Sequence, residues 1–259
     1  MKQEIIKNLG KSLYYAAKTK KNIPAISHQY KDFPIDDAYK IQKNMLEHYL
    51  ADGYHFSGRK VGMTSQAMRE QFGIDEPDYG YLFDELKFGN GSQLDMREFL
   101  APMVEAELAF VLKEDLDKPD VTVEEVLAAT DYVTAALEII DARSQHFDTT
   151  IADSIADNAS FAAYVIGDTI LPPESKDWSL IGMIAEKNGK QITTSSGASV
   201  MGNPACAVAW LANKMYSLKE PLKKGELILS GSFISAIPVD AGDLVTVKYG
   251  GFGELRVIF

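Results

Sequence analysis

Two glutamates interrupt an apolar, strand-forming segment of the chain, residues 104–112. They are Glu105 and Glu107, one residue apart. Side chains alternate across a β-strand, so both glutamates project from one face, with Cα atoms about 7 Å apart. The opposite face is apolar and comprises Ala106, Leu108, Phe110 and Leu112. The segment therefore predicts a buried strand that carries two acids on one side.

A third acid, Glu138, interrupts a second apolar segment, residues 135–141. Like charges held together inside a protein cost several kcal/mol unless their pKa values rise or a cation neutralises them. Three carboxylates without a nearby cysteine or histidine describe a site for a hard cation, Mg²⁺ or Mn²⁺. The alternative is a surface strand whose glutamates are solvated.

Composition excludes several classes of protein. With 259 residues, 46% of them hydrophobic, the chain can bury a sizeable core. Its net charge of −11 argues against nucleic acid and anionic membrane surfaces as partners. The lone cysteine, Cys206, lies in a segment expected to form a buried helix, and it cannot form an intramolecular disulfide. We find no signal peptide and no membrane-spanning segment, and we expect a cytoplasmic protein.

The chain divides into a helical part and a part rich in strands. Residues 1–53 predict a small helical N-terminal unit, with helices over residues 8–18 and from Asp36 or Asp37 to Gly53. In residues 54–259, short strands are separated by turn residues, and Asn188-Gly189 predicts a hairpin. A few helices follow capping signals, namely a capping box of Thr122 with Glu125 and the Asn203-Pro204 pair. The strands do not alternate regularly with long helices. We therefore expect an α+β protein whose larger part is a rolled, mostly β domain.

Two further charged residues are candidates for chemistry. Lys60 follows Arg59 in a strand candidate, so one of the two side chains faces the interior. An interior lysine near three carboxylates would stay charged and could bind a substrate carboxylate or donate a proton. An exposed lysine is the alternative. Asp78 lies in the segment 76–82, which we interpret as a turn, and turn formation alone explains an aspartate after Pro77.

Polar segments at residues 157–160 and 230–233 supply two candidate ligand-binding residues, Ser160 and Ser232. Each segment could present hydroxyl or backbone N–H groups to an anion, although loop capping is the commoner explanation. The four histidines show no metal-ligand spacing; His146 either borders a site or lies in a surface loop. The sequence has no phosphate-binding loop, nucleophile elbow or CxxC motif.

Taken in order, five segments resemble one known family. They are Gly58-Arg59-Lys60-Val61-Gly62-Met63-Thr64-Ser65, Glu76-Pro77-Asp78-Tyr79-Gly80, Val104-Glu105-Ala106-Glu107-Leu108, Ala136-Leu137-Glu138-Ile139-Ile140-Asp141-Ala142-Arg143 and Asp157-Asn158-Ala159. The chain resembles the 2-hydroxypenta-2,4-dienoate hydratase family of the fumarylacetoacetate hydrolase superfamily. This family includes 2-oxohept-3-ene-1,7-dioate hydratase and 4-oxalocrotonate decarboxylase.

The resemblance implies a mixed β-roll with a small helical N-terminal part. It further implies homo-oligomeric assembly, and it allows a complex with a paralogous pathway enzyme. It also implies a Mg²⁺ or Mn²⁺ ion held by Glu105, Glu107 and Glu138, with Lys60 and Asp78 in catalysis or substrate binding. One departure is Met103, because relatives commonly have a basic residue at this position. A charge partner of the metal site is then absent or supplied by another residue.

The resemblance favours a hydratase of aromatic meta-cleavage catabolism that converts 2-hydroxypenta-2,4-dienoate to 4-hydroxy-2-oxopentanoate. The alternatives are 4-oxalocrotonate decarboxylation, 2-oxohept-3-ene-1,7-dioate hydration, or a non-catalytic subunit that binds a 2-oxo acid or a metal. Hydrolysis of a C–C bond is less favoured, since no Glu-His pair is evident. Residues 231–238 contain no cation for a second substrate carboxylate, so the sequence favours the shorter monoacid.

Overall fold

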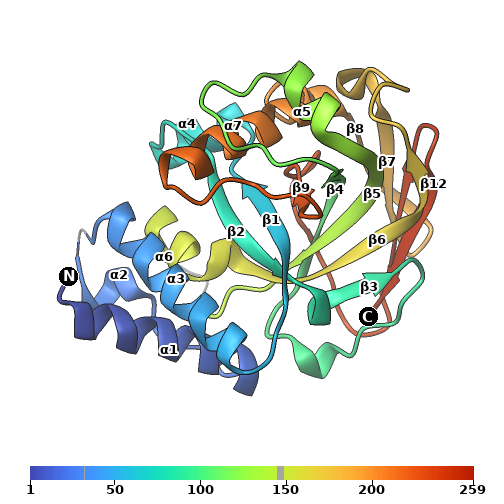
Figure 1. Cartoon of the computed structure of the whole chain (residues 1–259). Coiled ribbons are helices and arrows are strands. Elements are labelled where there is room, and N and C mark those ends of the chain that lie inside the picture. Colours follow the sequence, from blue (N-terminus) through green and yellow to red (C-terminus); the bar gives the residue numbers. More distant parts are fainter. Residues whose placement is uncertain (32, 145–148) are drawn as a thin grey trace.

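The computed structural model describes residues 1–31, 33–144 and 149–259. The chain begins with three helices, α1 (Gln3–Thr19), α2 (Ile26–Gln29) and α3 (Ile35–Ala51). Helices α1 and α3 pack side by side at one end of the molecule (Figure 1). Both are amphipathic and bury one face, for example Leu13 on α1 and Met45 on α3. The expected helices are confirmed, although α1 starts five residues before the predicted residue.

Within the described residues, the larger sheet has eight strands. It runs in the order β2 (Asp78–Phe83), β1 (Phe56–Gly62), β9 (Leu227–Leu229), β4 (Met103–Leu112), β5 (Thr130–Ile140), β6 (Phe161–Leu171) and β3 (Lys87–Gly89), and β10 (Ile237–Pro238) also pairs with β4. Strands β1 and β9 are parallel, as are β3 and β6, whereas the other pairs are antiparallel. The sheet is therefore mixed, as predicted.

A second sheet packs against the first at the side of the molecule (Figure 1). Its order is β12 (Gly253–Ile258), β11 (Leu244–Tyr249), β7 (Gly182–Lys187) and β8 (Lys190–Ser196). The turn between β7 and β8 places Asn188 and Gly189 at φ angles of 55° and 74°, which confirms the predicted Asn-Gly hairpin. The Tyr249 hydroxyl donates a hydrogen bond to the Glu107 carbonyl at 2.9 Å and so joins the two sheets.

Short helices connect the strands. They are α4 (Gln66–Phe72), α5 (Val123–Ala129), α6 (Ile151–Ala156) and α7 (Pro204–Ser217), with single 3₁₀ turns at Asp84–Leu86, Met96–Glu98, Asn158–Ser160, Trp178–Leu180 and Gly197–Ser199. Helix α5 begins with the predicted Thr122–Glu125 capping box, and Asn203 caps α7 as predicted. Cys206 lies on α7, where its side chain is half-buried instead of fully buried.

The N-terminal helices share one hydrophobic core with the sheets. Tyr49 of α3 stacks on Phe83 of β2, with ring centroids 4.6 Å apart, and both belong to a continuous buried cluster. The α+β class is thus confirmed, while the boundary after residue 53 stays a prediction. Among the residues that the structure describes, no helix is long and apolar enough to cross a membrane.

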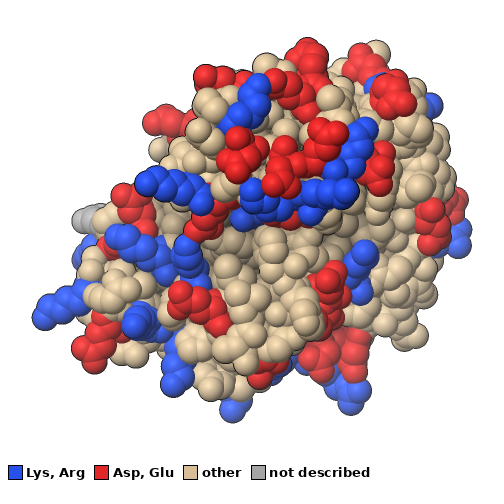
Figure 2. All heavy atoms as spheres, in the orientation of Figure 1, with Lys and Arg blue, Asp and Glu red and all other residues tan. Residues whose placement is uncertain are grey.

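Charged side chains of both signs are interleaved on the face seen in Figure 2. Over the described residues as a whole, ion pairs between acidic and basic side chains include Lys223, which lies 3.0 Å from Asp115 and 3.2 Å from Asp117, and Lys214, which lies 2.6 Å from Glu76. The expectation that nucleic acid and membrane surfaces are not partners stays a prediction based on net charge.

Candidate metal centre and its cavity

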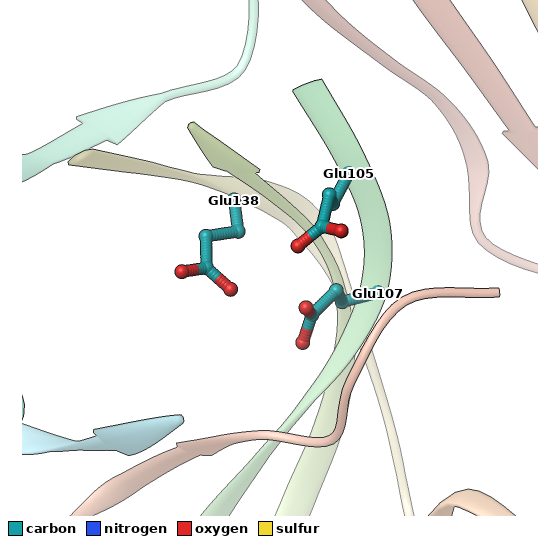
Figure 3. Close-up of side chains that lie close together, drawn as sticks. All are labelled: Glu105, Glu107 and Glu138. Atoms are coloured by element: carbon teal, nitrogen blue, oxygen red, sulfur yellow. The ribbon is translucent and has the colours of Figure 1, made fainter. Parts of the chain in front are cut away.

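The three glutamates converge because of the register between β4 and β5. Glu105 lies directly opposite Glu138 in this antiparallel pair, and Glu107 lies two residues further along β4. One carboxylate oxygen from each residue lies within 4.8 Å of the other two (Figure 3). Glu107 and Glu138 are only 1% and 0% exposed, which excludes the alternative of solvated surface glutamates for these two, whereas Glu105 is half-buried.

The carboxylates have fewer hydrogen-bond donors than buried groups require. The Gly231 N–H donates to Glu107 Oε2 at 2.7 Å. Glu107 Oε1 and both Glu138 oxygens are buried without a protein donor in hydrogen-bonding geometry. A buried acceptor without a partner is costly, and oxygen atoms arranged in this way are the ligands that Mg²⁺ and Mn²⁺ prefer. The residues present therefore fit a divalent cation.

Lys60 is the cation that the structure places beside these acids. Its side chain is buried, and its Nζ lies 3.1 Å from Glu138 Oε1. Burial opposes the ammonium charge, but Glu138, Asp78 and the other two glutamates outweigh this effect and raise the pKa of Lys60 above its usual value. Arg59 points to the opposite side of β1 and forms an ion pair with Glu226. The prediction that one of the two side chains faces the interior holds for Lys60, but Arg59 is buried as well, on the other side of the strand.

Asp78 lies in a strand, so our prediction of a turn over residues 76–82 is wrong at this residue. It is the first residue of β2 instead of part of a turn, and it pairs with Gly62 at the end of β1. Antiparallel pairing of the two strands brings Asp78 into the same buried group as Lys60. Burial raises the pKa of Asp78 above its ordinary value, while Lys60 opposes the shift.

The glutamates carry more negative charge than Lys60 neutralises. Burial and then Glu138 raise the pKa of Glu105 to about 7. Burial, followed by Glu138 and Glu105, raises the pKa of Glu107 well above its ordinary value. Among the described residues, four carboxyl groups, of which Asp78, Glu107 and Glu138 are fully buried, thus face the Lys60 ammonium group. A bound divalent cation would favour their ionised forms.

Gly62 allows Asp78 to approach the strand. A Cβ atom added at Gly62 would lie 2.1 Å from Asp78 Oδ1, closer than van der Waals contact permits.

We therefore expect Gly62→Ala to displace the Asp78 carboxylate and to lower kcat/KM by about 100-fold or more, since small misplacements in a catalytic site have effects of this size. Gly89→Ala is the control, because a Cβ atom added at Gly89 would meet no other atom within 4 Å. Gly91→Ala is not suitable, because Gly91 has a positive φ angle that alanine rarely adopts. Steady-state kinetics on both variants test this; wild-type kcat/KM in Gly62→Ala would contradict the placement of Asp78.

A cavity of about 490 Å³ reaches one of the three glutamates, Glu105; Glu107 and Glu138 are not among its lining residues. Its lining includes Lys60, Asp78 and Glu105, and it also includes both predicted serines, Ser160 and Ser232. The Ser232 hydroxyl donates to the Ile234 carbonyl at 2.7 Å and accepts from the Ile234 N–H, so loop capping accounts for at least part of its role. Other lining residues, among them Ser154, Ser199 and Ile140, could not be predicted, because they come from separate segments without a shared motif.

Ser160 is held at the cavity by a left-handed turn. Asn158, Ala159 and Ser160 have φ angles of 55°, 49° and 60°, which non-glycine residues rarely adopt in succession. The Asn158 side chain accepts a hydrogen bond from the Tyr81 N–H at 2.8 Å and donates one to the Tyr81 carbonyl at 2.9 Å. These contacts fasten the turn to β2, the strand that carries Asp78.

A buried ion pair supports the same turn from the other side. Arg143 Nε lies 2.7 Å from Asp157 Oδ1, and the arginine also donates to the carbonyls of Asp141, Asp157 and Phe161. The pair links the segment after β5 to the turn. His146 lies outside the described residues. Its two predicted positions, at the border of the site or in a surface loop, therefore both stay predictions.

Comparisons with known proteins agree with this geometry. Residues 52–258 match the family described as fumarylacetoacetate hydrolase C-terminal. The 2-keto-4-pentenoate hydratase of Paraburkholderia xenovorans LB400 is 41% identical over 250 residues, which cover 96% of this chain and 93% of the relative. The 2-oxo-hept-4-ene-1,7-dioate hydratase of Escherichia coli is 38% identical over 257 residues, which cover 97% of this chain and 96% of the relative.

A solved structure extends the match to the whole chain. The 4-oxalocrotonate decarboxylase from Pseudomonas putida G7, complexed with magnesium and adipate, superposes with a TM-score of 0.97 at 32% identity, covering 100% of this chain and 98% of the neighbour. The chain therefore belongs to the fumarylacetoacetate hydrolase superfamily, in the family that contains the 2-hydroxypentadienoate hydratases and 4-oxalocrotonate decarboxylase. The resemblance inferred from the five sequence segments is confirmed.

Proposed function

We propose that this protein is a divalent-metal-dependent hydratase that converts 2-hydroxypenta-2,4-dienoate to 4-hydroxy-2-oxopentanoate. One observation carries the proposal: three glutamates, two of them fully buried with unpaired oxygens, converge next to a buried lysine and aspartate. Glu105, Lys60 and Asp78 open this group to one cavity. Further support comes from the names of the most similar relatives, which include hydratases of 2-keto-4-pentenoate. In this proposal, Glu105, Glu107 and Glu138 hold Mg²⁺ or Mn²⁺.

The reaction needs two proton transfers and one addition of water. A proton moves from the 2-hydroxyl to C5, giving the 2-oxo-3-enoate; water oxygen then adds to C4 as a proton is delivered to C3. A divalent cation supplies the positive charge that stabilises negative charge on the 2-oxygen. The chain's own residues must hold the substrate and move the protons.

Lys60 and Asp78 have complementary properties for these roles. The raised pKa of Lys60 keeps its ammonium charged, so it binds the substrate carboxylate or the developing enolate oxygen. Asp78 has an upward-shifted pKa and an Oδ1 atom without a hydrogen-bond partner, so it can accept and return a proton. Ser160 lines the same cavity, where its hydroxyl can orient the substrate carboxylate or the water.

The proposal predicts Mg²⁺- or Mn²⁺-dependent loss of dienoate absorbance without release of CO₂. The assay should use five- to seven-carbon 2-hydroxydienoates, with and without a terminal carboxylate, and should monitor absorbance and CO₂ together. Stoichiometric CO₂ release from 4-oxalocrotonate would identify a decarboxylase instead. A protein that binds Mg²⁺ and oxalate but converts none of these substrates would be a non-catalytic binding subunit.

Decarboxylation of 4-oxalocrotonate is the second candidate function. It is favoured by the solved decarboxylase, whose structure matches this chain over its whole length. Loss of CO₂ from that substrate needs the same stabilisation of an enolate, so the three glutamates and Lys60 serve either reaction. Homo-oligomeric assembly, association with a paralogous pathway enzyme and a cytoplasmic location stay predictions.

A further inference from the structure

An apolar pair of residues lies next to the acidic pair on the paired strands. Along β4, Met103, Glu105 and Glu107 alternate with Val104 and Ala106, so the first three share one face. Along β5, Ile140 shares a face with Glu138. The register pairs Glu105 with Glu138 and Met103 with Ile140, and both apolar side chains line the cavity. Two residues of strand separate the acidic pair from the apolar pair, a distance of about 7 Å.

The rest of the cavity wall around this pair is uncharged. Phe233, Ile234 and Ala236 contribute apolar groups, and serines contribute hydroxyls. Among the described lining residues, Lys60 is the single cation, and it lies beside Glu138. The other charged lining residues are acids, Asp78 and Glu105. A second carboxylate on the substrate would therefore lose its hydration without gaining a free cationic partner.

We propose that Met103 and Ile140 bind the hydrocarbon end of the substrate and thereby select 2-oxo acids with an uncharged tail. This inference rests on the proposed function, because the charged head of the substrate is placed at the acidic pair and Lys60. Three bonds of an extended chain, from C2 to C5, span about 3.8 Å, which is about half of the distance between the two pairs. C5 and the atoms beyond it therefore come within contact distance of the apolar side chains. The cavity of about 490 Å³ leaves room for a substituent beyond C5.

Binding of stable 2-oxo acids tests this inference without relying on turnover. Protein loaded with Mn²⁺ is titrated calorimetrically with pyruvate, 2-oxobutanoate, 2-oxopentanoate, 2-oxohexanoate and 2-oxoadipate. Wild-type affinity should rise with each methylene of the monoacids by up to about fourfold, the value for complete burial of the group. The six-carbon 2-oxoadipate should bind about tenfold or more weakly than 2-oxohexanoate, because its terminal carboxylate lacks a partner.

Variants of Met103 distinguish binding energy from the hydrocarbon tail of the ligand from binding energy of its 2-oxo acid head. Met103→Ala should remove most of the gain per methylene while leaving pyruvate affinity within about twofold, and Met103→Leu should retain the gain. Met103→Arg should raise the affinity for 2-oxoadipate relative to 2-oxohexanoate by about tenfold or more. Ile192→Ala is a matched control, since Ile192 is exposed on β8 and lines a neighbouring cavity.

Three results would overturn the inference. They are a flat affinity series in the wild type, wild-type affinity for 2-oxoadipate equal to that for 2-oxohexanoate, and an unchanged series in Met103→Ala. If dienoates are hydrated while any of these is observed, the proposed function survives and only the role of Met103 and Ile140 fails. If the Mn²⁺-loaded protein binds no 2-oxo acid and converts no dienoate, both proposals fail.

Discussion

Replacing Glu107 by glutamine is expected to abolish tight binding of Mg²⁺ and Mn²⁺ and to lower kcat/KM by at least about 100-fold. Glutamine keeps the shape of the side chain and can still accept the Gly231 N–H bond through its amide oxygen. It removes one ionisable carboxyl from a group of four neighbouring acids, three of them fully buried. The metal-free variant should therefore be at least as stable as the metal-free wild type, since a buried carboxyl under mutual repulsion has been replaced by a neutral amide.

Calorimetric Mn²⁺ titration and thermal denaturation, with and without metal, measure these effects. Glu124→Gln on α5 provides a matched control, because Glu124 is an exposed glutamate outside the cavity. The control should keep wild-type metal affinity and turnover. Undiminished metal-dependent activity in Glu107→Gln would remove this residue from the proposed metal ligands.

Replacing Lys60 by methionine is expected to abolish turnover by a different route. The variant loses the ammonium group that lies beside four carboxyl groups, three of them fully buried, so its metal-free form should lose about 3–5 kcal/mol of stability. A divalent cation then neutralises the remaining acids. Saturating Mg²⁺ should therefore stabilise Lys60→Met more than it stabilises the wild type, and metal affinity should be retained or increased.

The two variants thus give opposite results for metal binding while both lose activity. Thermal denaturation over a series of Mg²⁺ concentrations distinguishes them, with Lys43→Met as a control because Lys43 is exposed and pairs with Glu220. Loss of metal binding in Lys60→Met, to the extent expected for Glu107→Gln, would show that Lys60 supports the metal site instead of acting on the substrate.

The central strands and their acids could be predicted because their signal is local. An acid in an apolar, strand-forming segment has few explanations, and strand alternation places Glu105 and Glu107 on one face. Likewise, the Thr122–Glu125 capping box and the Asn188-Gly189 turn are short-range patterns with a direct structural meaning. The pairing of Glu105 with Glu138 was not readable from the residues alone, because register depends on the whole sheet.

Asp78 shows why a local pattern can mislead. Pro77 and Gly80 favour a turn, but pairing with β1 makes Asp78 the start of a strand. Gly80 is needed for another reason, since a Cβ there would lie 2.7 Å from the Asn158 carbonyl oxygen. The close approach of a distant segment, and not the turn preference, explains this glycine.

The left-handed turn at Asn158–Ser160 could not be predicted from its own residues. Ala159 and Ser160 do not favour positive φ angles, and the turn contains no glycine. Its conformation is imposed by hydrogen bonds to Tyr81 and by the Arg143–Asp157 ion pair, which are distant in sequence from one another. By contrast, α6 was missed although its capping box, Thr150 with Asp153, is a readable signal.

We propose above all that Glu105, Glu107 and Glu138 hold one divalent cation beside Lys60. The most direct measurement is a crystal structure of the Mn²⁺-soaked protein with data collected at a wavelength that gives anomalous scattering from manganese. We predict a single strong anomalous peak among the three carboxylates, with Mn–O distances of about 2.0–2.3 Å. A peak at another site, or none between these carboxylates at saturating Mn²⁺, would contradict the account.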